Sequence, residues 1–338
     1  MESRKIQVSA GGSFFIVLPK DWSKDIGLKK GGRVNVILEE DGSIKLLPSD
    51  RLRDLVRKAT LQVEEFSAPK PLDFQIKAYY MSGCNIIDIV SKKRIDPELK
   101  KAIKTSAGEL IGVETAEETS DRLSLRAIVD PAGFPLENLH RRLCTLSLSM
   151  YSDTMKAFRE KDLDLVDDVI ERGQEAMKLY RLMIRQLMLA HANRNVAKSL
   201  GIEHSSQCIT MGIFARDVSR FIYHISSTAV HTREILKTQT TYQDSITKAT
   251  MKLFESIFEM VKNAFKAFME RDIPLANKVI KHMGEVRKLD EIAEREIFQN
   301  LKEVQTAIRL AAIIRELRRT AGYAVAMADD TIFHNTIS

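Results

Sequence analysis

The chain has 338 residues, of which 44% are hydrophobic and 29% are charged, and its formal net charge is +6. This balance excludes an intrinsically disordered protein and predicts a soluble chain of two or three domains. No uncharged apolar run approaches the roughly 20 residues that span a bilayer, and the first residues lack the apolar stretch of a signal peptide. We therefore expect a cytoplasmic protein.

Cysteine, proline and glycine are unevenly distributed. The three cysteines, Cys84, Cys144 and Cys208, form no Cys-x-x-Cys pair, which argues against structural disulfides and against a thiolate zinc site. Seven of the eight prolines and ten of the fifteen glycines precede residue 137. Because these residues break helix interiors, we expect a turn-rich front part and long helices behind it.

The first segment, residues 4–48, is typical of short strands around tight turns. Residues 14–18 and 34–38 favour strands, Asp41-Gly42 favours a hairpin turn, and residues 19–28 favour a short helix that ends at Gly27. Only about 45 residues with few core positions would be marginal alone, so we expect this segment to need a partner.

This segment resembles the swapped-hairpin domain of the AbrB/MazE type (SpoVT-AbrB). The resemblance lies in the run GGSFFIVLPKDWSKDIGLKKGGRVNVILEEDGSIKLLP, in which a strand, Leu-Pro, a helix and Gly-Leu-x-Lys-Gly follow one another. In that family two chains interlace their hairpins into one barrel that binds DNA. The resemblance implies that residues 1–49 form a homodimer-forming, DNA-binding domain.

Basic side chains agree with DNA binding. Through Arg33 the segment has seven basic and three acidic residues, a net charge of +4, which dimerisation would double on a surface suited to phosphates. Family members often carry arginines at the positions of Ser13 and Ser23, so the alternative that the domain only dimerises stays open. The candidate DNA contacts are Arg4, Lys5, Lys20 and Lys24.

The middle of the chain predicts a small α+β unit over residues 73–130, preceded by an extended linker at Ala68-Pro69-Lys70-Pro71. The sequence assigns this unit no chemical role. Its expected elements are a helix at 73–81, a strand at 85–90, a helix at 97–107, and strands at 110–117 and 122–129.

The back of the chain repeats itself. Residues 155–181 return as residues 265–291, with 11 of 27 positions identical, where chance would give roughly two. Asp162 and Asp272 occupy N-cap positions, and Pro274 falls in a first helical turn. We expect two antiparallel three-helix bundles, over residues 136–237 and 243–332. Their helices are expected at 136–160, 163–195, 205–237, 243–270, 273–300 and 302–330.

This half resembles the PhoU family, whose members contain two such repeats. The shared features are AFxxxDxxLxxxVI at 157–170 and 267–280, a following Glu and Lys-Leu, and the third-helix arginines Arg220 and Arg319. The domain order resembles that of archaeal phosphate-uptake regulators, in which a swapped-hairpin domain is followed by an α+β unit and two PhoU repeats. The expected fold class is therefore mostly α and multidomain, with a swapped-hairpin β domain, a small α+β unit and two tandem three-helix bundles.

The carboxylates that define metal-binding members of this family are missing. Those members hold multinuclear iron or zinc with carboxylates spaced i, i+4, which lie on one helix face. We therefore expect no metal cluster and no cofactor. The corresponding positions here are Gly173, Met177, Ser219, Tyr223, Met283, Arg287, Arg318 and Gly322.

Two other sets of residues resemble weak metal sites. His224, His231 and Glu234 share a helix face, but the two histidines would lie about 10.5 Å apart along the axis, too far for one ion. His191, His204 and Cys208 flank a helix joint. We expect both sets to be ordinary interface or surface residues.

The sequence predicts a regulator rather than an enzyme, because it contains no phosphate-binding GxxxxGK[ST] loop, no GxSxG and no HExxH motif. The resemblances imply a cytoplasmic homodimer that regulates phosphate uptake and binds DNA. Its PhoU-like bundles would receive the phosphate signal from the cytoplasmic face of a phosphate ABC transporter or from a sensor protein. The alternative is an adaptor that acts on the transporter without binding DNA.

Overall fold

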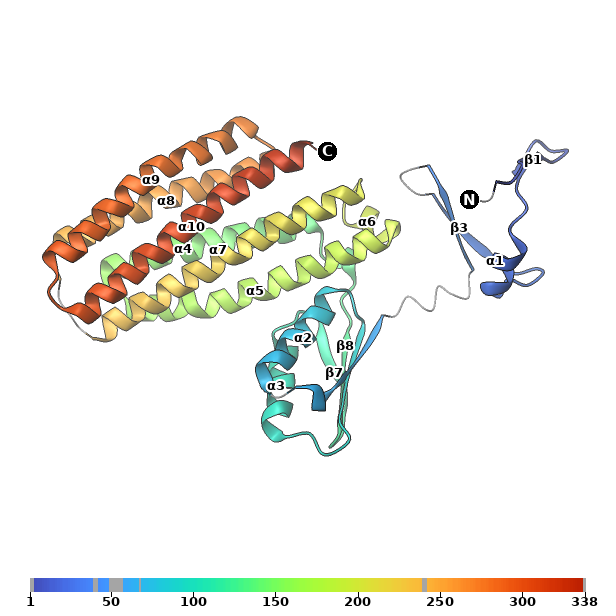
Figure 1. Cartoon of the computed structure of the whole chain (residues 1–338), viewed down its shortest axis with the longest axis horizontal. Helices are drawn as coiled ribbons and strands as arrows, with labels where there is room; N and C mark the ends of the chain where they lie inside the picture. Colours follow the sequence, from blue (N-terminus) through green and yellow to red (C-terminus); the bar gives the residue numbers. More distant parts are fainter. Residues whose placement is uncertain (1–2, 39–41, 49–56, 67, 239–241, 337–338) are drawn as a thin grey trace. The chain divides into compact units, whose positions relative to one another are not determined.

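The computed structural model describes residues 3–38, 42–48, 57–66, 68–238 and 242–336 (Figure 1). The chain divides into two compact units, Met1–Arg57 and Lys58–Ser338. Short strands make up most of the regular structure of the first unit, and long helices dominate the second. This confirms the mostly α, multidomain fold class.

The described part of the first unit contains two small antiparallel hairpins and one short helix. Strand β1 (Gln7–Val8) pairs with β2 (Phe14–Phe15), and β3 (Val34–Leu38) pairs with β4 (Ile44–Pro48). Helix α1 (Lys20–Asp25) is followed by Gly27 at a φ of +69°, which explains the glycine at this position. Strand β2 is shorter than the predicted 14–18, because β1 supplies only two pairing residues. Asp41 of the predicted turn lies outside the described residues.

No described residue of the first unit is buried. Eight of its large apolar side chains are instead exposed, from 47% of Phe15 to 76% of Phe14. A folded unit of this size needs a core to offset the entropy of ordering its chain. This apolar set comprises Ile6, Val8, Phe14, Phe15, Ile16, Val17, Val36 and Ile44.

The second unit begins with an α+β layer pair. A four-stranded sheet has the order β5-β6-β8-β7, in which β5 and β6 are parallel and the other neighbours antiparallel. Two helices cover one face of the sheet (Figure 1). The elements are β5 (Lys58–Gln62), α2 (Pro69–Met81), β6 (Ile86–Val90), α3 (Pro97–Gly108), β7 (Val113–Glu118) and β8 (Arg122–Ala127).

The sequence expectation for this region was wrong at the prolines. Pro69 and Pro71 do not form an extended linker, because they begin α2. Proline is tolerated in the first helical turn, where its missing N–H has no intrahelical partner to lose. Strand β5 was missed altogether. Its alternating pattern, with only Ala59 and Leu61 buried, is too short to stand out before the tertiary contacts are known.

Six long helices form the rest of the second unit, close to the predicted limits. One short helix, α6 (Arg194–Ser199), was not predicted. The long helices are α4 (Leu136–Glu160), α5 (Leu163–Ala192), α7 (Ser205–Lys237), α8 (Asp244–Glu270), α9 (Ile273–Asn300) and α10 (Val304–Thr336).

The two three-helix copies share one hydrophobic core. At its centre Tyr151 of α4 is 1% exposed, donates a hydrogen bond to the carbonyl of Phe254 on α8 at 3.1 Å, and stacks on Phe221 of α7. Phe214 of α7 stacks on Phe268 of α8 at 3.5 Å between ring centroids. Aromatic rings from both copies thus interlock, and neither copy has a separate core.

The turn between the first and second helix is the same in both copies. Asp162 accepts a hydrogen bond from Leu165 N at 3.0 Å, and Asp272 accepts one from Leu275 N at 2.9 Å, which confirms both predicted N-caps. The preceding residues, Lys161 and Arg271, have φ of +58° and +56°. A side chain in this left-handed region carries strain that glycine avoids.

Candidate functional site

The described basic residues of the first unit are exposed. Arg4 and Lys5 precede β1, and Lys20 and Lys24 are one turn apart on α1. Residues at i and i+4 share a helix face, so both ammonium groups can reach one strand of phosphates. DNA contact by these four residues stays a prediction.

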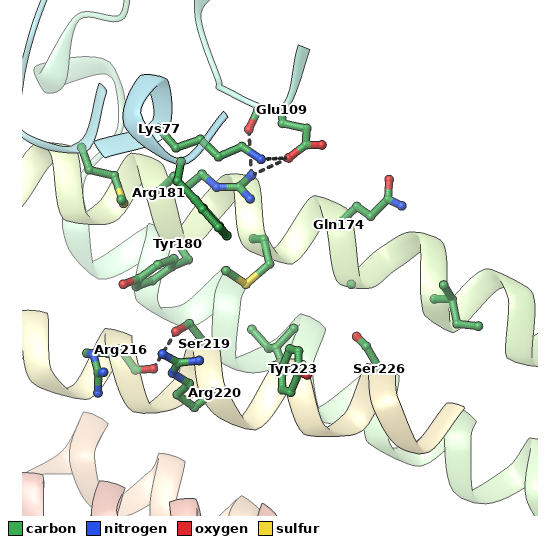
Figure 2. A pocket seen from close by; sticks show the side chains of 16 residues that line it. Lys77, Glu109, Gln174, Tyr180, Arg181, Arg216, Ser219, Arg220, Tyr223 and Ser226 are labelled. Carbon is green, nitrogen blue, oxygen red and sulfur yellow. Dashed lines mark hydrogen bonds and ion pairs between the residues drawn. The ribbon is translucent and has the colours of Figure 1, made fainter. Parts of the chain in front are cut away.

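A cavity of about 610 Å³ lies between α2 of the α+β unit and helices α5 and α7 of the first copy (Figure 2). We call it the α2/α5/α7 cavity. Apolar and aromatic side chains form much of its wall, and its charged groups are four cations and one carboxylate. These are Lys77, Arg181, Arg216, Arg220 and Glu109.

In the first copy, all four positions of the lost metal ligands line this cavity. They are Gly173 and Met177 on α5, and Ser219 and Tyr223 on α7. Gly173 is needed for close helix packing, because a Cβ atom there would lie 2.5 Å from Ser226 Oγ of α7. A larger side chain at residue 173 would therefore require the Ser226 hydroxyl to rotate away or α5 and α7 to move apart.

In the second copy, salt bridges occupy the corresponding face. Arg318 Nη1 of α10 lies 3.2 Å from Asp290 Oδ2 and 4.0 Å from Glu294 Oε1, both on α9. Arg287 is exposed on the same helix as these carboxylates. At this face of the second copy, the carboxylates of α9 neutralise Arg318.

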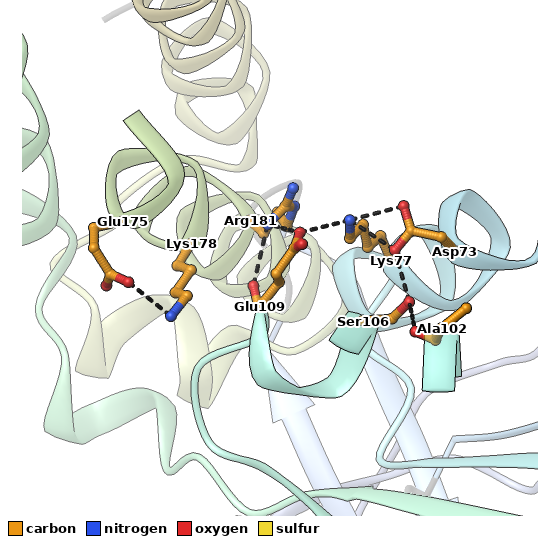
Figure 3. A network of polar contacts seen from close by, with 8 residues as sticks. All are labelled: Asp73, Lys77, Ala102, Ser106, Glu109, Glu175, Lys178 and Arg181. Atoms are coloured by element: carbon orange, nitrogen blue, oxygen red, sulfur yellow. Dashed lines mark hydrogen bonds and ion pairs between the residues drawn. The ribbon is translucent and has the colours of Figure 1, made fainter. Parts of the chain in front are cut away.

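A polar network joins the α+β unit to α5 (Figure 3). Lys77 Nζ of α2 lies 2.7 Å from Asp73 Oδ1 and 2.6 Å from Glu109 Oε2. Arg181 Nη1 of α5 donates to the Glu109 carbonyl at 3.1 Å and lies 3.4 Å from Glu109 Oε2. Glu109 thus bridges a cation from each side of the junction.

Arg185 is the buried anchor of the same junction. It is 1% exposed, and its Nη1 donates hydrogen bonds to the carbonyls of Tyr80 at 2.9 Å and Cys84 at 2.7 Å. The guanidinium also lies 5.0 Å from the centroid of the Tyr80 ring. Since Tyr80 is near the C-terminus of α2, the cation meets unsatisfied carbonyls and the negative end of the helix dipole.

In both sets of residues that resemble weak metal sites, some members make contacts that stabilise the fold. His224 is buried, and its Nδ1 lies 2.6 Å from Glu316 Oε2 of α10. His204 caps α7 together with Gln207, while Cys208 is buried. Across the described ranges, no cluster of three or more histidine, cysteine, aspartate or glutamate side chains suits a metal ion.

One carboxyl group between α7 and α10 is strongly perturbed. Asp330 of α10 is 7% exposed. Burial, together with the charges of Asp217 and Asp329, raises its pKa to about 7. Burial also raises the pKa of Asp217 on α7, although Arg216 and Arg220 partly offset the effect. Ionisation of Asp330 therefore opposes the packing of α10 on α7.

Sequence reasoning missed the junction residues Lys77, Glu109, Arg181 and Arg185. The sequence shows only that an arginine recurs here, since the 110-residue offset aligns Arg295 with Arg185. Arg295 is exposed whereas Arg185 is buried, so the shared arginine gave no hint that one copy would be covered by the α+β unit.

The described helices include none that is long and apolar enough to cross a membrane. The family model described as "PhoU domain" matches residues 140–234 and 250–331. The model "Antidote-toxin recognition MazE, bacterial antitoxin" matches residues 7–54. No curated protein matches the sequence.

Two solved structures share the fold. PhoU from Pseudomonas aeruginosa has a TM-score of 0.54 and 16% sequence identity, covering 60% of this chain and 96% of that one. The phosphate transport system regulatory protein PhoU from Streptococcus pneumoniae has a TM-score of 0.50 and 16% identity, covering 60% and 94%. The two PhoU matches, of 95 and 82 residues, cover 177 of the 338 residues, and the chain therefore belongs to the PhoU family.

Proposed function

We propose that this chain is a homodimeric, DNA-binding regulator of phosphate transport. Its N-terminal unit would dimerise and bind DNA, and its helical copies would receive the phosphate signal from a protein partner. The observation that carries the proposal is the joint presence, on one small unit, of an exposed apolar set and exposed basic residues.

The apolar set supports dimerisation. Eight large apolar side chains of the first unit are between 47% and 76% exposed, and none of its described residues is buried. Burying apolar surface is worth about 25 cal/mol per Å², so a second copy of the unit would supply the missing core. The match to a MazE-type model over residues 7–54 agrees with this interpretation.

The phosphate assignment is supported by membership of the PhoU family and by the likeness to a phosphate transport system regulatory protein, PhoU from Streptococcus pneumoniae. The partner we propose is the cytoplasmic face of a phosphate transporter or a phosphate sensor. Affinity capture of this chain from cells grown in low and high phosphate should recover such a partner in one condition more than in the other.

The test of DNA binding is a mobility-shift titration at several salt concentrations. The probes are duplexes from upstream of this chain's own gene and of phosphate-transporter genes, with a random duplex of equal length for comparison. Because phosphate contacts release counterions, affinity should fall steeply with salt, and the slope should decrease by about 0.9 for each contact removed. The variant Lys20→Gln with Lys24→Gln removes four lysines from a dimer and should lower the slope by up to about 3.6.

A matched control is available on α8, where Lys262 and Lys266 are also four residues apart and exposed by 57% and 58%. Neutralising this pair should leave the salt dependence unchanged. If the wild-type chain is a dimer and shows no salt-dependent affinity for any duplex, the adaptor function, without DNA, replaces this proposal. A monomeric chain would contradict both versions.

A further inference from the structure

We propose that the α2/α5/α7 cavity binds a nucleotide, with its phosphates on Arg216 and Arg220 and its base among the aromatic side chains of the cavity wall. This site is independent of the DNA-binding function proposed above, because it belongs to the second unit and concerns a small ligand.

The two arginines are available for an anion. Arg216 and Arg220 are one turn apart on α7, exposed, and part of the cavity wall (Figure 2). Among the residues that the structure describes, neither guanidinium forms an ion pair with a carboxylate, and Asp217 of the same helix interacts with both only through its longer-range charge. Two neighbouring guanidinium groups can contact one phosphate chain with several charge-assisted hydrogen bonds.

The cavity's own carboxylate does not compete with such an anion. Glu109 is already bound between Lys77 and Arg181, at 2.6 Å and 3.4 Å. Asp217, the acidic neighbour of both arginines in sequence, interacts electrostatically with both of them but does not line the cavity. The cavity therefore keeps an excess of positive charge.

Aromatic rings at the cavity indicate a planar ligand group. Phe74 of α2 is 60% exposed and Tyr223 of α7 is 59% exposed, and both line the cavity together with Tyr180 of α5. Exposed aromatic rings stack on nucleobases with a gain of about 1–3 kcal/mol per base. Gln174, on α5, and Ser226, on α7, add polar groups to the wall that can hydrogen-bond to a sugar or a base edge.

The size of the cavity favours a nucleotide over inorganic phosphate. Its volume is about 610 Å³, in the range of about 300–1,000 Å³ that holds drug-sized and cofactor-sized ligands. A phosphate ion would occupy only the end at the arginines and leave the aromatic wall uncovered. The combined chemistry of the wall fits a ligand that is anionic at one end and planar at the other.

The second copy lacks this arrangement, although it carries the equivalent arginines. Arg315 and Arg319 of α10 are also four residues apart, and they lie 3.5 Å and 3.7 Å from Glu316. The tyrosine at residue 180 corresponds to Asp290, which pairs with Arg318. The first copy alone combines unpaired arginines with aromatic rings on this face of the described helices.

The test is isothermal titration calorimetry on the full-length protein with ATP, GTP, ADP, AMP, adenosine and inorganic phosphate. At least one nucleotide should bind, and adenosine and phosphate alone should each bind at least about 10-fold more weakly. The variant Arg216→Gln with Arg220→Gln should weaken nucleotide binding about 100-fold. The matched variant Arg315→Gln with Arg319→Gln should bind as the wild type does.

A second variant approaches the same site from the aromatic wall. Tyr223→Ala should weaken nucleotide binding about 10-fold or more and leave phosphate binding unchanged. All substituted side chains are exposed, and circular dichroism will verify that each variant is folded. The proposal is overturned if no nucleotide binds, if phosphate binds as tightly as the nucleotides, or if the α7 and α10 arginine variants lose affinity equally.

Discussion

Replacing Arg185 by methionine tests whether this side chain holds the α+β unit against α5. Methionine keeps most of the apolar volume of arginine and removes the donors to the Tyr80 and Cys84 carbonyls, at 2.9 Å and 2.7 Å. It also removes the cation from the Tyr80 ring, at 5.0 Å. The substitution therefore reports on polar contacts at the junction more than on packing.

The expected loss follows from these contacts. A hydrogen bond from a charged donor contributes about 1.5–3 kcal/mol, and a desolvated cation–π contact up to about 2 kcal/mol. Relief of the cost of burying the charge offsets part of this sum. We expect Arg185→Met to lower the free energy of unfolding by about 2–4 kcal/mol.

The assay is scanning calorimetry combined with hydrogen exchange measured by mass spectrometry. Because the α+β unit has its own hydrophobic core, loss of the anchor should separate its unfolding from that of the helices. A second, lower transition should appear, and amides of α2 and β6 should exchange faster than those of α8.

The matched control is Arg295→Met, at the equivalent position of the second copy, where the side chain is exposed. It should change stability by less than about 0.5 kcal/mol. If both variants unfold with the same midpoint and the same exchange pattern, Arg185 does not anchor the junction and the reasoning is wrong.

Three further perturbations test the helical half. Burial and two neighbouring carboxylates raise the pKa of Asp330 from 3.8 to about 7, so its contribution favours the folded state below about pH 4 and is lost as the pH rises through 7. Asp330→Asn should therefore raise the free energy of unfolding at pH 8 by an amount on the order of 2–4 kcal/mol, with a smaller gain at pH 5. An equal gain at both pH values would contradict this. Lys161→Gly and Arg271→Gly should each stabilise the fold by roughly 0.5–1 kcal/mol in urea titrations, because glycine adopts a positive φ without strain. Destabilisation by either substitution would show that the backbone is not strained there. Gly173→Ala should lower the free energy of unfolding by about 1–3 kcal/mol through overpacking. The control Gly284→Ala, whose added Cβ meets nothing within 4 Å, should raise it by about 0.5–1 kcal/mol. Equal effects would show that α5 and α7 do not pack tightly at residue 173.

Local patterns predicted the helical half well. The 3.6-residue spacing of apolar side chains located six long helices, and the caps Asp162 and Asp272 are set by contacts within one turn, which a sequence displays directly. Predictions that rested on glycine and proline were less reliable. Gly27 ended its helix as predicted, but Pro69 and Pro71 began a helix instead of forming a linker, because proline suits both settings.

The candidate sites were only partly predictable for a physical reason. The basic residues Lys20 and Lys24 are visible in the sequence, since exposure and charge are local properties. The cavity is not, because its wall combines α2 with α5 and α7, which lie more than 80 residues further along the chain. Nothing in residues 73–130 indicates that they cover the first copy rather than the second.

The sequence by itself determined the repeat, the helices, their caps and the loss of the metal-ligand carboxylates, because each depends on residue identity at short spacing. Only the tertiary structure decided what surrounds the positions where these carboxylates are missing. In the first copy, Gly173 lets α5 and α7 approach and the α+β unit closes over them, which leaves Arg220 facing a cavity. In the second copy, Arg319 meets a carboxylate of its own helix. The partner of Arg319 lies within one helical turn and is set by local sequence, whereas the cavity at Arg220 exists because α2 and α5, from distant parts of the chain, pack beside α7.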